Sequence, residues 1–84
     1  MAYTWQDYKG MTETGRLIGR KVEMVKADEA QIGVLSTGER IAVALVLNKT
    51  ELFPKGDYTI LQAVDRLGEE WLAAAILVQK AMDA

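Results

Sequence analysis

The sequence of 84 residues contains no cysteine and no histidine. Without cysteine the chain has no disulfide framework and no thiolate nucleophile. Without histidine it lacks the side chain that most often serves as a general base near neutral pH and as a metal ligand. We therefore expect a protein that is not an enzyme and that holds no metal and no other cofactor.

The chain also lacks a strong charge of either sign and a long apolar segment. Its formal net charge is −2, so no long-range field draws it toward phosphate backbones. The longest apolar runs, residues 41–47 and 71–78, are far shorter than the roughly 20 residues that cross a bilayer. The first ten residues do not show the basic start and apolar core of a secretory signal. We expect a cytoplasmic protein that does not enter membranes and for which nucleic acid is a disfavoured partner.

What the chain does contain is the composition of a folded protein. Half of its residues are hydrophobic and 26% are charged, which is close to the average of globular domains and far from that of disordered chains. A chain of this length has room for one small core. We expect a single helical domain over residues 1–84.

The stretch "LSTGERIAVALVLNK" (residues 35–49) admits two interpretations. In the first, Ser36 and Glu39 have the spacing of a capping box, and a helix runs on to the neighbourhood of Phe53, where Pro54 and Gly56 end it. In the second, residues 37–38 form the turn of a β-hairpin whose strands alternate apolar and polar positions. The helix is favoured because Thr-Gly is a weak turn signal and the second strand would be rich in alanine.

The C-terminal third predicts two helices. Thr59 and Gln62 have capping-box spacing, and an apolar stripe follows that ends before Gly68; its members are Ile60, Leu61, Val64 and Leu67. In "EEWLAAAILVQKAM" the acids stand at the start and Lys80 near the end, where the helix dipole favours each charge.

The first third predicts a helix that begins after Thr12, although Gly15 and Gly19 each cost about 1 kcal/mol relative to alanine inside a helix. Asp28 with Gln31 predicts the start of a further short helix. The resulting fold class is all-α, a compact bundle of four to five short helices that ends in a helical hairpin. The alternative is an α+β fold with an N-terminal β-meander within residues 20–47.

The sequence contains only weak motifs for phosphate binding, metal binding or catalysis. Residues 10–16 have the two glycines of a phosphate-binding loop, but Arg16 and Leu17 stand where that loop needs Lys and Ser or Thr. The carboxylates of Asp65, Glu69 and Glu70 lack the spacing of a calcium loop and suit the first turn of a helix. Ser36 is more typical of a helix cap than of a nucleophile, because no activating base is placed beside it.

The run 71–78 is apolar nearly all the way round, which is more than a surface helix needs. Its residues either belong to the chain's own core, form the seam of a dimer, or contact a different protein. The candidate interface consists of Trp71, Ala74, Ala75, Val78 and Met82.

The basic side chains gather in residues 16–26, where Arg16, Arg20, Lys21 and Lys26 are candidates for contact with an acidic partner or with nucleic acid, although Glu13 and Glu23 interrupt them. We expect a small soluble, non-catalytic protein that acts by protein contact and is able to self-associate. An accessory, regulatory or inhibitory factor fits, of the kind that small bacterial and phage chains often are. The alternative is a weak nucleic-acid-binding regulator that uses residues 16–26.

Overall fold

The computed structural model describes residues 4–54 and 58–83. Within these ranges 79% of the residues are helical and none lies in a β-strand. The fold is therefore all-α, and the β-meander alternative is wrong. Its α-helices are α1 (Glu13–Ala27), α2 (Thr37–Leu47), α3 (Ile60–Leu67) and α4 (Glu69–Asp83), and short 3-10 helices occupy Trp5–Asp7 (η1), Glu29–Val34 (η2) and Thr50–Leu52 (η3).

Helix α2 begins at the predicted capping box. The Ser36 hydroxyl accepts a hydrogen bond from the Glu39 backbone N–H at 3.2 Å, and the Glu39 carboxylate accepts one from the Ser36 N–H at 3.0 Å. These two bonds satisfy backbone donors that no earlier turn of the helix could satisfy. The helical interpretation of residues 35–47 is confirmed.

The end of α2 differs from the prediction, which extended the helix to Phe53. The helix ends at Leu47 because Asn48 adopts the left-handed conformation, with φ 56° and ψ 42°. The Lys49 N–H then donates to the Ala44 carbonyl at 2.9 Å, and the Asn48 N–H donates to the Leu45 carbonyl at 3.1 Å. This pair of bonds is the Schellman motif, which satisfies the last carbonyls and turns the chain away.

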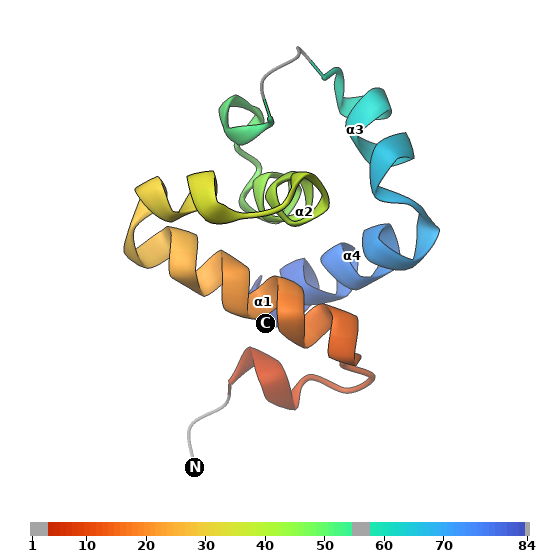
Figure 1. Cartoon of the computed structure of the whole chain (residues 1–84). Coiled ribbons are helices and arrows are strands. Elements are labelled where there is room, and N and C mark those ends of the chain that lie inside the picture. The colour runs from red at the N-terminus through yellow and green to blue at the C-terminus, as the bar shows by residue number, and fades with distance from the viewer. Residues whose placement is uncertain (1–3, 55–57, 84) are drawn as a thin grey trace.

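Helix α2 occupies the centre of the molecule. Figure 1 shows it nearly end-on, with the other helices around it, and it contacts α1, α3 and α4. Its residues 41–44 are all at most 1% exposed. The apolar run that begins at Ile41 is thus covered on several sides by the chain itself.

Helix α1 begins after Thr12, whose hydroxyl accepts from the Gly15 N–H at 3.0 Å. The two glycines that weaken it have a packing role. A Cβ at Gly19 would overlap the six-membered ring of Trp5, and a Cβ at Gly15 would lie 2.7 Å from the sulfur of Met11. The N-terminal segment therefore packs on α1 where α1 lacks side chains, and Trp5 is buried there.

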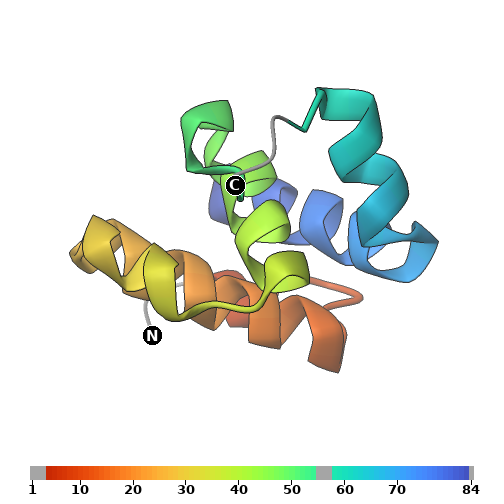
Figure 2. The same cartoon turned by 45° about the horizontal axis from the view of Figure 1, so that its top comes forward.

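Helices α3 and α4 follow each other directly and meet at Gly68, whose φ of 86° suits glycine. The predicted caps are present, since the Thr59 hydroxyl accepts from the Gln62 N–H at 3.1 Å. The predicted stripe of α3 is wrong in part, because α3 buries Ala63 and Leu67 and leaves Ile60 and Leu61 exposed. Figures 1 and 2 show α3 at the edge of the molecule. No helix in the described ranges is long and apolar enough to cross a membrane.

Candidate interaction surfaces

An apolar groove lies where α2, α3 and α4 meet. It encloses ≈ 120 Å³, with the buried side chains of Val46 and Ala75 among its lining. Val64 of α3 and Leu72 and Ile76 of α4 also line it. Leu45 and Gln79 complete the lining, so Gln79 is its only polar member.

Large apolar side chains continue from this groove onto the outer surface. Leu61 is 81% exposed, Ile60 is 57% exposed and Ile76 is 46% exposed. Residues three and four apart on a helix share a face, so Ile60 and Leu61 stand on the same side of α3 as Val64. We call Ile60, Leu61, Val64, Leu72 and Ile76 together the α3–α4 apolar face, since its members come from these two helices.

Gln79 fixes one end of the groove. Its side-chain amide donates to the backbone carbonyl of Val46 at 3.2 Å. That carbonyl belongs to the last turn of α2, where no following helical N–H is available to it. The bond holds α4 against the end of α2.

Most of the interface expected from sequence is buried in the chain's own core, and only Ala75 of its members also lines the groove. Ala74, Ala75 and Val78 are at most 4% exposed within the single chain, and their side chains contribute to its own core. Trp71 and Met82 are half-buried and pack against that core. The exposed apolar surface of α4 is instead centred on Ile76, which the sequence interpretation did not single out.

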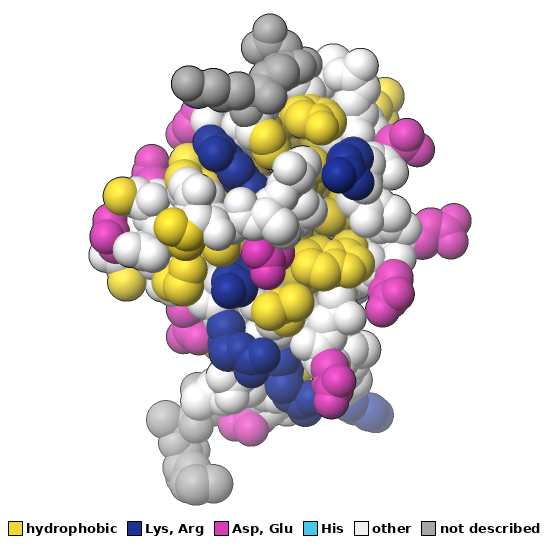
Figure 3. All heavy atoms as spheres, in the orientation of Figure 1, with side chains coloured by type: hydrophobic (Ala, Val, Ile, Leu, Met, Phe, Trp, Pro, Cys, Tyr) yellow, Lys and Arg dark blue, Asp and Glu magenta, His cyan; other side chains and the backbone are white. Residues whose placement is uncertain are grey.

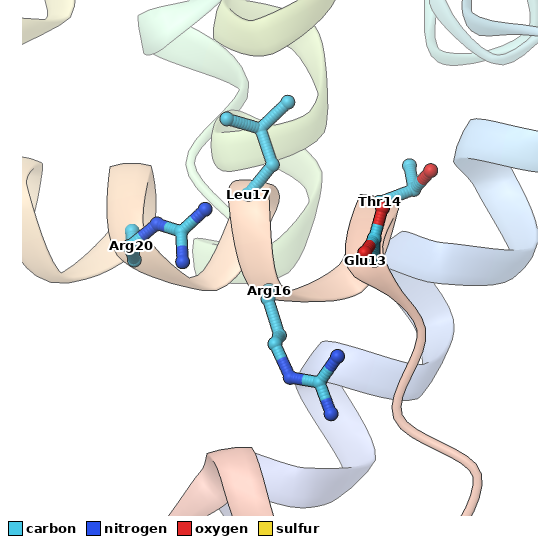
Figure 4. Close-up of a pocket in the computed structure, with 5 residues that line it drawn as sticks. All are labelled: Glu13, Thr14, Arg16, Leu17 and Arg20. Carbon is cyan, nitrogen blue, oxygen red and sulfur yellow. The ribbon is translucent and has the colours of Figure 1, made fainter.

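The basic residues of segment 16–26 all lie on α1. Arg16, Arg20 and Lys26 are exposed, and Lys21 is half-buried. Figure 3 shows Lys and Arg side chains in a band low on the face that α1 crosses. A shallow hollow of ≈ 530 Å³ beside them is lined by Glu13, Thr14, Arg16, Leu17 and Arg20. Figure 4 shows Arg16 and Leu17 projecting to opposite sides of α1, with Arg20 one turn further along.

The carboxylates considered for chemistry do not converge. In the described part of the chain, no three Asp or Glu side chains are grouped closely enough to share a metal ion. The Glu70 carboxylate instead accepts a hydrogen bond from the Thr14 hydroxyl at 3.4 Å, which joins the first turns of α1 and α4. Ser36 serves as a cap, as described above.

Two surfaces thus stand out from an otherwise mixed exterior, the α3–α4 apolar face and the arginine-bearing face of α1. The sequence did not predict the α3–α4 apolar face, but it did single out the arginines that lie on α1. No protein-family model, curated protein or solved structure matches this chain.

Proposed function

We propose that this chain is a non-catalytic binding protein that acts by docking a helix of another protein chain on its α3–α4 apolar face. The observation that carries the proposal is the groove with apolar walls, together with the exposure of Ile76 in its lining and of Leu61 and Ile60 on α3. Three large aliphatic side chains left in water on adjoining helices form an unusual surface for so small a protein, and such patches mark interaction sites.

A helix is the partner element that fits this surface. The groove runs between two helices, and a third helix packs best when its side-chain ridge lies in such a channel. Along α4 the lining extends from Leu72 to Gln79, a rise of about 10 Å. That length accepts two or three apolar side chains spaced three or four residues apart on one helix face.

Burial of the exposed side chains supplies the driving force. Covering a Leu or Ile side chain fully is worth about 1.5–3 kcal/mol relative to leaving it in water. The fold buries three of its large aliphatic side chains incompletely, so part or most of this free energy is still to be gained when a partner covers them. These side chains are Leu61, Ile60 and Ile76. Association costs several kcal/mol of lost freedom, so all three side chains should be needed for a stable complex.

The test is site-specific photo-crosslinking in cells that naturally express the chain. A photoreactive residue at Leu61 should form a discrete adduct with a polypeptide, and the substitution Ile76→Asp should abolish that adduct. The matched control places the same residue at Arg66, which is also exposed on α3. Identical adducts at both positions, or no polypeptide adduct at Leu61, would contradict the proposal.

The mass of the adduct identifies the partner class. An adduct of twice the 9.3 kDa chain mass would mean that the docked helix comes from a second copy. Light scattering on the purified protein across a range of concentrations should then show a dimer that Leu61→Asp converts to a monomer. Any other mass with a monomer in solution assigns the face to a different protein.

A further inference from the structure

The outer face of α1 carries an ordered pattern of charge. Glu13, Arg16, Arg20 and Glu23 are spaced by three, four and three residues, so they share one face of the helix, and all four are exposed. The two arginines are neighbours one turn apart. Like charges at this spacing destabilise a helix by a few tenths of a kcal/mol, and the opposite charges of Glu13 and Glu23, each three residues from an arginine, offset that cost.

Neither arginine has a side-chain partner among the residues that the structure describes. In the described residues the single ion pair joins Lys49 to Glu29 at 3.5 Å, and no hydrogen bond involves the guanidinium of Arg16 or Arg20. Arg40 shows the contrast, because its Nε donates to the Leu52 carbonyl at 2.7 Å and ties η3 to α2. The fold uses Arg40 and leaves Arg16 and Arg20 available to a ligand.

The geometry of the hollow decides what kind of ligand fits. Arg16 and Leu17 project to opposite sides of α1, and Arg20 lies one turn along (Figure 4). A small anion held by both guanidiniums at one point does not match this spread, whereas an extended ligand with two acidic groups does. Leu17 is half-buried and projects away from Arg16, so the two guanidinium groups supply the contacts on this face.

We propose that Arg16 and Arg20 bind a short acidic segment of a polypeptide through two of its carboxylates. Guanidinium groups recognise carboxylates by paired, charge-assisted hydrogen bonds. Glu13 and Glu23 close the site at both ends, so its positive stretch extends over one turn, about 6 Å. A nucleic-acid backbone would continue past that turn and meet both glutamates, which repel phosphate.

The experiment measures binding of a fluorescein-labelled Gly/Ser decapeptide with Glu-Leu-Glu at its centre, by fluorescence anisotropy with the whole chain. Arg16→Gln and Arg20→Gln should each weaken binding about tenfold, as the loss of one charge-assisted pair implies. Arg66→Gln changes the net charge equally at a distant exposed site and should leave the affinity nearly unchanged. The corresponding Gln-Leu-Gln peptide should not bind.

Three results would overturn the proposal: no binding of the acidic peptide, an equal loss in Arg66→Gln, or tighter binding of a single-stranded decanucleotide. The last result would assign the face to nucleic acid. Circular dichroism checks the fold of each variant, and Arg16→Lys, which keeps the charge but lacks the fork, should fall between wild type and Arg16→Gln. The α3–α4 apolar face is untouched by these variants, so this test and the crosslinking test fail independently.

Discussion

The contact between Trp5 and Gly19 predicts that Gly19→Ala lowers the stability of the wild-type protein but raises it when Trp5 is replaced by leucine. Glycine inside a helix costs about 1 kcal/mol relative to alanine, so Gly19→Ala should stabilise α1 if nothing else occupied the space. The three atoms nearest to the position of the new Cβ all belong to the Trp5 ring, and they lie too close for it. The indole must therefore leave its site in Gly19→Ala.

The cost of that displacement is bounded by the contribution of the ring. Trp5 is 8% exposed, and truncation of a buried tryptophan to alanine costs about 3–5 kcal/mol. After the gain in helix propensity is subtracted, Gly19→Ala should lower the free energy of unfolding by about 2–4 kcal/mol. In a Trp5→Leu background, which lacks the ring atoms, the same change should raise it by about 1 kcal/mol.

The measurement is urea unfolding followed by far-UV circular dichroism for wild type, both single variants and the double variant. Circular dichroism is chosen because it remains a probe when the indole is removed. The double-mutant cycle should give a coupling energy of about 3–5 kcal/mol. Stabilisation by Gly19→Ala in both backgrounds would refute the packing of Trp5 on α1.

Three further predictions concern the ends of α2 and the two sides of α3. Ser36→Ala should cost about 1 kcal/mol through loss of the capping box, while Thr37→Ala beside it should change stability by less than about 0.5 kcal/mol; equal effects in urea melts would contradict the cap. Asn48→Gly should be neutral or stabilising and Asn48→Ala should cost about 1 kcal/mol, because the left-handed conformation penalises a Cβ; thermal denaturation should rank them in that order. Leu61→Asp should change the unfolding free energy by less than about 0.5 kcal/mol, whereas the buried Leu67→Ala should cost about 2–5 kcal/mol. A large loss in Leu61→Asp would mean that Leu61 is buried.

The starts of α1, α2 and α3 were predictable from sequence because each is set by a local hydrogen bond. Ser36, Thr59 and Thr12 each accept from a backbone N–H three residues along, and that bond depends on spacing alone. The end of α2 was predicted wrongly although Asn48 carries the signal, since asparagine tolerates the left-handed conformation. Pro54 and Gly56 are the stronger sequence signals for a helix end, and they predict it several residues too late.

The roles of the glycines in α1 could not be predicted from sequence, because they depend on tertiary contacts. Propensity alone counts Gly15 and Gly19 as defects in a helix. The role of Gly19 appears only when Trp5, fourteen residues before it in the sequence, is found against the helix surface, and Gly15 likewise makes room for Met11. No local pattern links the two positions, because the contact depends on how the N-terminal segment folds back.

The α3–α4 apolar face escaped prediction for a related reason. Helix α3 has apolar residues at five of its eight positions, so its sequence offers more than one stripe that could face inward. The face that packs inward is the one with Ala63, which is 0% exposed. Its small side chain lets α3 approach α2 more closely than a leucine would. Leu61 is thereby turned outward, and the fold forgoes the roughly 1.5–3 kcal/mol that its burial would provide. A partner helix that covered Leu61 would recover that free energy, so changes on the exposed side of α3 should alter affinity for a partner, and changes on its buried side should alter the stability of the isolated chain.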